Sequence, residues 1–265
     1  MENINLASIK RKTIIDKIVR ILFLATTIIC SLCVVFIAIF ILIKGLTPFF
    51  KSYEVNGNLY KVSVTKFLFG NRWFKSPNIY GAGYIVVDTI LVSVLSLLIS
   101  VPISILTALF IARIAPKKIA MVLNTMVELL SGIPSIIYGL FGMGVITKLV
   151  IGIGNLFGVQ TAGGLSLLAT ALVLAMMILP TITMISVTSI KSVSNSLVLG
   201  SLALGASTTQ TNFKVVLTSA KSGIFSGIIL GVGRALGEAT AVSMVCGNAI
   251  SGPSLNLLQT TRTLT

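Results

Sequence analysis

The sequence contains no histidine and very few acidic side chains. Asp and Glu together number 6 against 20 Lys and Arg, and charged residues make up 10% of the 265 residues, where a soluble domain carries about 25%. Hydrophobic residues reach 55% and the mean hydropathy is +1.05. This composition excludes an ordinary soluble domain and predicts an all-α integral membrane protein.

The missing histidine removes the commonest metal ligand and general base. The cysteines lie in apolar runs, and Cys30-x-x-Cys33 lacks the further ligands of a zinc site. No Gly-x-x-x-x-Gly-Lys-Ser/Thr motif is present, so any ATP must be bound by another protein. We therefore expect no catalytic residue, metal or cofactor in this chain. The basic residues lie mostly between apolar runs, which favours contact with the lipid bilayer over nucleic acid.

Five apolar runs are long enough to cross a bilayer, for which ~20 helical residues suffice. They cover 21–43, 83–112, 119–147, 165–189 and 222–246. The first run is longer than a signal-peptide core and no small-residue cleavage site follows, so we interpret it as a retained span. Asp88 lies near the outer end of the second run and is interpreted as an interface residue that reaches water. The glycine-rich stretch 148–164 is typical of an interfacial or re-entrant piece.

Polar segments flank these runs. Residues 1–20 form a polar tail, and 44–82 contains a predicted hairpin in which Tyr53–Val55 pairs with Leu59–Val64 around Asn56-Gly57. Segment 190–221 predicts two short helices broken at Gly205, whose amphipathic pattern favours a docking surface for another protein. Segment 247–265 is polar and loop-like, with a turn at Gly252-Pro253.

The distribution of basic residues predicts the orientation. With the N-terminus cytoplasmic, the inside segments 1–20, 113–118 and 190–221 hold 5, 3 and 3 basic residues, and the outside loops 146–164 and 247–265 hold one each. Loop 44–82 is basic as well and conflicts with the rule, which is weaker for long folded loops. We expect a multi-pass protein of the inner or plasma membrane.

The last apolar run carries Arg234 and Glu238, although an ionisable side chain at the bilayer centre costs roughly 3 kcal/mol or more. The two lie four residues apart and so share one helical face. One interpretation is a packing face with an internal ion pair; the one we prefer is a helix lining a route for a charged solute. Nearby glycines are expected to mark close packing or a helix break: Gly227, Gly231, Gly233 and Gly237.

The third run carries a further intramembrane carboxyl group. Glu128 lies ~14 Å into this run by helix rise, near mid-membrane. Pro134 follows it and is expected to break the helix, which is tolerated at membrane depth where the backbone faces protein or a water-filled cavity. A proline kink beside a protonated glutamate is the alternative. We assign Glu128 to the pathway with Arg234 and Glu238.

Segment 190–221 resembles the cytoplasmic coupling loop of ABC-importer permeases. Ser201-Leu-Ala-Leu-Gly-Ala206 and Val215-Val-Leu217 match its centre and end, whereas Leu199-Gly200 replaces the usual Glu-Ala and Thr218 replaces a proline. These departures affect the usual salt bridge to the ATPase. The resemblance implies that the following residues contact that ATPase: Ser201, Ala203, Gly205, Ala206, Phe213 and Leu217.

Three further motifs resemble phosphate-importer permeases, the first most closely the PstC type: Glu128–Gly139, Met177–Thr181 and Gly233–Val242. The resemblance covers 80–262. It implies a type I ABC-importer permease domain of six helices, with five present here and a sixth expected beyond Thr265. It also implies a homologous second permease, two ATPase subunits that hold ATP and Mg, and an external phosphate-binding protein.

On this interpretation the chain is half of a passive channel, and ATPase closure transmitted through 196–218 would rock its helices. Arg234 would bind phosphate oxygens, and Glu238 would pair with Arg234 when the path is empty. The alternatives are a permease for another oxyanion such as molybdate or sulfate, an ATP-independent secondary transporter or channel, and a membrane assembly protein whose charges serve packing. The coupling-loop pattern favours the ATP-driven importer.

Overall fold

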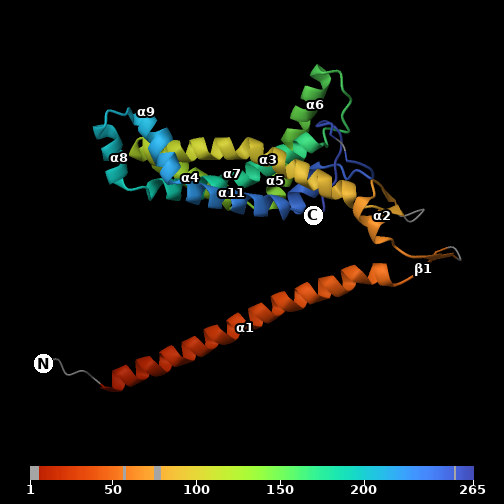
Figure 1. The fold of residues 1–265 in the computed structure, drawn as a ribbon, viewed down its shortest axis with the longest axis horizontal. Helices are drawn as coiled ribbons and strands as arrows, with labels where there is room; N and C mark the ends of the chain where they lie inside the picture. Colours follow the sequence, from red (N-terminus) through yellow and green to blue (C-terminus); the bar gives the residue numbers. More distant parts are fainter. Residues whose placement is uncertain (1–5, 56–57, 75–78, 254) are drawn as a thin grey trace. The chain divides into compact units, whose positions relative to one another are not determined.

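A computed structural model describes residues 6–55, 58–74, 79–253 and 255–265. The chain divides into two compact units, Met1–Val64 and Thr65–Thr265 (Figure 1). The first unit holds one long helix and a hairpin, and the second is a bundle of helices. The predicted permease region, 80–262, falls within the second unit.

The first unit is dominated by helix α1, Leu6–Phe50, which is 45 residues long. The stretch Lys12–Phe50 is strongly apolar and long enough to cross a lipid bilayer. Strands β1 (Tyr53–Val55) and β2 (Asn58–Tyr60) follow it and pair antiparallel, with Tyr53 opposite Tyr60. The predicted antiparallel pairing is confirmed, but the second strand ends at Tyr60 rather than Val64, where helix α2 (Val64–Phe69) begins. The turn residues 56–57 lie outside the described residues.

The second unit begins with helix α2 (Val64–Phe69, starting at the boundary) and the strand pair β3 (Trp73–Phe74) and β4 (Ile79–Tyr80). Its helices follow in the order α3 (Gly83–Leu109), the π-helical turn η1 (Phe110–Ile114), α4 (Lys117–Ser131), α5 (Ser135–Phe141), the π-helical turn η2 (Gly142–Ile146), α6 (Thr147–Leu156), α7 (Leu167–Lys191), α8 (Asn195–Ala203), α9 (Thr208–Gln210), the π-helical turn η3 (Thr211–Val216), α10 (Leu217–Ser219), α11 (Lys221–Leu236) and α12 (Thr240–Val245).

Helix α7 is the centre of this bundle. It packs along α3 and α11 and also contacts α4, and it is the most deeply buried of the long apolar helices. One apolar core surrounds Met177 and Ile178, and a second surrounds Ile190 and Val216. Helices α8 and α9 lie at one end of the bundle and α6 at the other (Figure 1). The second core therefore lies where α8 and α9 join the bundle.

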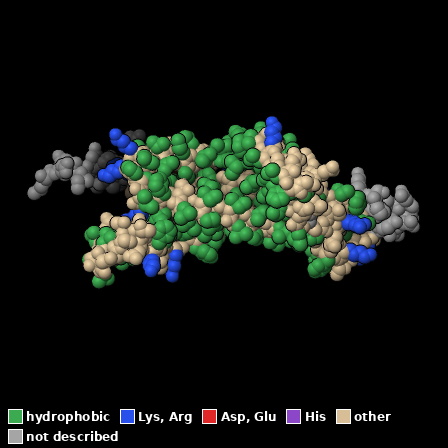
Figure 2. Space-filling model, turned by 90° about the horizontal axis from the view of Figure 1, so that it is seen from above, with side chains coloured by type: hydrophobic (Ala, Val, Ile, Leu, Met, Phe, Trp, Pro, Cys, Tyr) green, Lys and Arg blue, Asp and Glu red, His purple; other side chains and the backbone are tan. Residues whose placement is uncertain are grey.

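Four helices in the described residues are long and apolar enough to cross a membrane: Lys12–Phe50, Gly83–Ile114, Ser135–Leu156 and Leu167–Lys191. A fifth is added if the pair Thr208–Ser219 and Lys221–Leu236, bent by 66°, counts as one span. Figure 2 shows apolar side chains over most of the face in view, with Lys and Arg in a few separate places. The prediction of an all-helical integral membrane fold is confirmed.

The third predicted span, 119–147, differs from the observed helices. Gly132 ends α4, and Pro134, which has no backbone N–H to donate, stands directly before α5. The helix then continues past 147 to Leu156, so much of the stretch predicted as an interfacial piece is helical. Glycine weakens a helix by only about 1 kcal/mol per residue, and buried Val150 supplies the packing that offsets this cost.

The fifth predicted span, 222–246, is also interrupted. Helix α11 ends at Leu236 with Gly237 as its C-cap, and α12 starts at Thr240. The carboxylate of Glu238 accepts a hydrogen bond from the backbone N–H of Ala241 at 3.0 Å. This bond satisfies one of the backbone N–H groups that have no intrahelical partner at the start of α12. Arg234 and Glu238, predicted to lie on one continuous helix, therefore lie on opposite sides of a helix break.

Candidate functional site

The small-residue face of α11 lies against α7. A Cβ atom at Gly231 would stand 2.8 Å from the Ile182 side chain, and one at Gly227 would stand 3.2 Å from Ile185. Gly223 continues the series one turn earlier, where a Cβ would overlap Ser189. The glycines therefore let α7 approach closely. Sequence reasoning omitted Gly223, although its four-residue spacing from Gly227 pointed to it.

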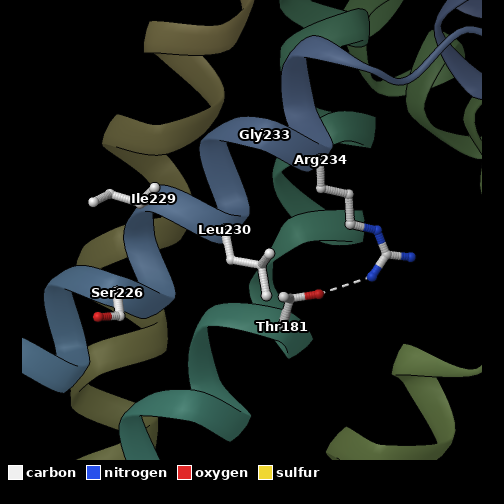
Figure 3. A pocket seen from close by; sticks show the side chains of 6 residues that line it. All are labelled: Thr181, Ser226, Ile229, Leu230, Gly233 and Arg234. Atoms are coloured by element: carbon white, nitrogen blue, oxygen red, sulfur yellow. Dashed lines mark hydrogen bonds between the residues drawn. The ribbon is translucent and has the colours of Figure 1, made fainter. Parts of the chain in front are cut away.

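One turn beyond this contact, Arg234 reaches from α11 to α7 (Figure 3). Its Nη1 donates a hydrogen bond to Thr181 Oγ1 at 2.8 Å. The two residues line an open groove of about 600 Å³, which is completed by Ser226, Ile229, Leu230 and Gly233. The groove is therefore apolar apart from one guanidinium and two hydroxyl groups.

The guanidinium of Arg234 retains most of its hydrogen-bonding capacity. Arginine carries five N–H donors, and the bond to Thr181 is the one hydrogen bond found for this side chain among the described residues. Its charge lies half-buried between apolar side chains, where an unpaired cation is costly. Such a group favours an anion with several oxygens, since these can accept in the geometry of the guanidinium.

Glu238 does not pair with Arg234. Within the described part of the chain no ion pair joins the two, and the Glu238 carboxylate instead accepts from the Ala241 N–H. The backbone carbonyl of Glu238 accepts from Thr265 Oγ1 at 2.7 Å. The helix break at Gly237 removes the register that would have placed the two charges on one face, so the predicted pair is wrong for this conformation.

Glu128 lies outside the groove. It is exposed on α4, where its Oε1 accepts a hydrogen bond from Asn124 Nδ2 at 2.5 Å. Pro134 stands at the break that follows, and Tyr138 O–H spans this break by donating to the Leu130 carbonyl at 2.8 Å. The structure thus does not bring Glu128 together with Arg234 within this chain.

The remaining glycines have different surroundings. Gly233 lines the groove, and a Cβ at this position would meet no atom within 4 Å. Gly237 lies in the break between α11 and α12. Of the four predicted glycines, Gly227 and Gly231 therefore pack closely against α7, whereas Gly233 leaves its part of the groove wall without a side chain.

The segment predicted to dock another protein forms two helices with a turn between them, as its pattern predicted. Gly205 makes the turn with φ +86°, a conformation that favours glycine. Ser201 Oγ lies 3.0 Å from Thr211 Oγ1 and links α8 to η3, while Ala206 is half-buried in the turn. Leu217 packs against the second core.

The outer surface of this helical pair is apolar and open. Ala203 and Phe213 are exposed, and Leu204 is 91% exposed. Further leucines of α8 are exposed beside them: Leu197, Leu199 and Leu202. Such a patch at the end of a bundle is typical of a protein-binding surface.

Contacts of two arginines, Arg262 and Arg113, were not expected from the sequence. Asp88, predicted as an interface residue that reaches water, is fully buried instead, and the backbone N–H of Arg262 donates to its Oδ2 at 3.5 Å. The Arg262 guanidinium also stacks over Trp73, 5.5 Å from the ring centroid. At the other end, Arg113 Nη2 donates to the carbonyls of Ile190 and Val193 at 3.3 and 3.2 Å. The residues that each arginine contacts lie far from it in the sequence, so no local sequence pattern revealed these contacts.

The described residues contain no group of three or more His, Cys, Asp or Glu side chains that could hold a metal ion. The groove presents one guanidinium and two hydroxyl groups, which can bind an anion.

Comparison with known proteins points to one family. Residues 100–261 match the family model described as the binding-protein-dependent transport system inner membrane component. The chain is 35% identical over 201 residues to the phosphate transport system permease protein PstC of Pasteurella multocida, covering 71% of this chain and 63% of that protein. It is 37% identical over 231 residues to the probable ABC transporter permease protein YqgH of Bacillus subtilis, covering 86% and 71%.

The chain thus spans less than two thirds of the length of that PstC relative. Among solved structures it is similar to a chain of the inward-facing MetNI methionine ABC transporter, with 19% identity, a TM-score of 0.42, and coverage of 62% of this chain and 84% of that one. From the matched family model and the relatives at 35 and 37% identity, the chain belongs to the family of binding-protein-dependent transport system inner membrane components.

Proposed function

We propose that this chain is a permease subunit of an ATP-driven phosphate importer and forms half of its translocation pathway. The observation that carries the proposal is the half-buried Arg234, which retains free N–H donors in an open apolar groove. A soluble anion entering this groove would replace the solvation that the guanidinium lacks there. The similarity to PstC proteins favours phosphate over other oxyanions.

The proposed complex contains a homologous second permease that closes the groove, two ATPase subunits and an external phosphate-binding protein. The exposed leucines of α8 and the turn at Gly205 support an ATPase contact at that end of the bundle. We expect the N-terminus and the α8 end on the cytoplasmic side, as the distribution of basic residues predicts. ATP and Mg bind in the ATPase, and this chain contributes no catalytic group.

In this mechanism Arg234 binds the anion only while the groove is accessible. Its hydrogen bond to Thr181 holds the guanidinium in place without neutralising it, because a hydroxyl carries no charge. Movement of α8 and α9 reaches α7 and α11 through the second core, which includes Ile190, Val216 and Ile224. Closing the groove on one side and opening it on the other would release the anion.

The test is uptake of labelled phosphate by the assembled complex in proteoliposomes. We expect Arg234→Gln to lower ATP-dependent uptake at least about tenfold, since it removes a charge-assisted contact, with co-purification of the ATPase unchanged. Lys148→Gln, at an exposed residue of α6 outside the groove, is the matched control and should retain uptake.

Normal phosphate uptake by an assembled Arg234→Gln complex would refute the proposal. Uptake that persists without ATP would favour a secondary transporter instead. Preference for sulfate or molybdate over phosphate in competition would support the permease role but reassign the substrate.

A further inference from the structure

Thr181 differs from four of the five other hydroxyl residues on its helix; the fifth, buried Ser186, has no hydrogen-bond partner for its Oγ among the described residues. Threonine and serine side chains in helices commonly donate to the carbonyl four residues earlier. Four α7 residues do so, at 2.8–3.1 Å: Thr170, Thr183, Thr188 and Ser189. Thr181 instead accepts from Arg234, and no acceptor for its own O–H is found among the described residues. Its hydroxyl hydrogen is therefore available to a ligand.

The position of Thr181 points this hydrogen-bonding capacity at the groove. The residue lines the groove beside Arg234, and Figure 3 shows the two side chains meeting from α7 and α11 with Leu230 beside them. A hydroxyl oxygen can accept one hydrogen bond and donate another at the same time. Accepting from a cation polarises the O–H group and strengthens its donation. An anion bound by Arg234 is thus the fitting acceptor.

We infer that Thr181 is a second anion-binding residue of the groove: it orients the Arg234 guanidinium and donates its hydroxyl hydrogen to the same tetrahedral oxyanion. The inference rests on the proposed function, since it takes the transported anion as the ligand. It adds a residue on α7, so the anion would be bound by both helices at once. Separation of α7 from α11 during transport would then break one of the two contacts and lower affinity for the anion.

A purely structural role for Thr181 has a different consequence. If the Thr181 hydroxyl only orients Arg234, its loss changes how fast the anion-free guanidinium reacts. It does not then remove a hydrogen bond to the anion. Labelling of Arg234 by phenylglyoxal, read by mass spectrometry on the assembled complex, separates the two effects. The labelling rate without anion reports orientation, and the phosphate concentration that halves the rate reports binding. Exposed Arg72, which does not line the groove, is the internal control.

We expect inorganic phosphate to protect Arg234 but not Arg72 in the unaltered complex. Thr181→Val, which keeps the side-chain shape, should raise the half-protecting phosphate concentration about tenfold, as expected for one lost hydrogen bond to a charged group. Thr181→Ser keeps the hydroxyl and should stay within about twofold. Thr181→Ala serves as a second hydroxyl-free variant should the valine variant fail to assemble.

An unchanged half-protecting concentration in the hydroxyl-free variants would overturn the inference while leaving the proposed function intact. A raised concentration in Thr181→Ser as well would also overturn it, because side-chain packing rather than the hydroxyl would then be responsible. Absence of any phosphate protection in the unaltered complex would refute both the inference and anion binding at Arg234.

Discussion

Two arginines contact α7, one near its end and one near its middle, and they are used in opposite ways. Arg113 donates from a single nitrogen to two backbone carbonyls, of Ile190 and Val193, beside the second core. Arg234 donates to one hydroxyl and faces an open groove. Both side chains are half-buried, so exposure alone does not distinguish them. They differ in the group that accepts their hydrogen bonds, which is the backbone for Arg113 and a side-chain hydroxyl for Arg234.

The difference follows from what each position offers. The last carbonyls of a helix lack intrahelical partners and carry partial negative charge, so a guanidinium near the end of α7 is stabilised by the backbone itself. Near the middle of α7 the hydrogen-bond partner of Arg234 is a neutral hydroxyl, that of Thr181. The charge of Arg113 therefore serves the fold, whereas that of Arg234 remains available for a ligand.

The largest expected effect on stability is at Arg113. We expect Arg113→Met to lower the free energy of unfolding by about 2 kcal/mol, because two hydrogen bonds from a charged donor are lost. Arg234→Met should change it by less than about 1 kcal/mol, since one hydrogen bond is lost but an unpaired cation is also removed. Thermal unfolding of the two variants in the same detergent measures the difference. Equal losses would contradict the comparison.

A second, smaller contrast lies on α11 itself. We expect Gly231→Ala to destabilise by about 1–2 kcal/mol, since its Cβ would lie 2.8 Å from Ile182. Gly233→Ala meets open space and should stabilise by up to about 1 kcal/mol through helix propensity. The pair is matched because both are helical glycines two residues apart. Destabilisation by Gly233→Ala equal to that by Gly231→Ala would show that α11 packs differently from the structure described.

The smallest effect is expected at Glu238. Its carboxylate holds the Ala241 N–H, and a glutamine oxygen can accept the same bond, so Glu238→Gln should leave stability within about 0.5 kcal/mol. Glu238→Ala removes the acceptor and should cost about 1 kcal/mol. If Glu238 instead paired with Arg234, the glutamine variant would lose as much stability as the alanine variant. Thermal unfolding of both variants decides between these roles.

The sequence predicted those features that depend on composition and local chemistry. Long apolar runs predicted the spanning helices, and the turn signal Asn56-Gly57 predicted the hairpin. Arg234 was singled out because its charge lies in an apolar run. Gly237 was among the glycines expected to mark close packing or a helix break, but the run 222–246 was predicted as one span, because apolar periodicity continues through it. The break depends on the Glu238 side chain competing for a helix donor.

The groove itself was only half predictable. Thr181 is one of several hydroxyl residues in an apolar helix, and its local sequence does not distinguish it from Thr183. Its role depends on how α11 packs against α7, which places Arg234 opposite one threonine and not the other. The burial of Asp88 beside Arg262 was missed for the same reason, since 174 residues separate the two.

The two helix breaks have a mechanical consequence. Helix α5, which follows Pro134, packs on α12, which follows Gly237, and a Cβ at Gly139 would lie 3.1 Å from the Ala241 backbone. Helix α11 packs on α7, and α5 and α12 contact α7 as well. The segments beyond both breaks are thus joined to each other and to α7, so a displacement of α7 would be felt by both. Arg234 lies three residues before the break at Gly237.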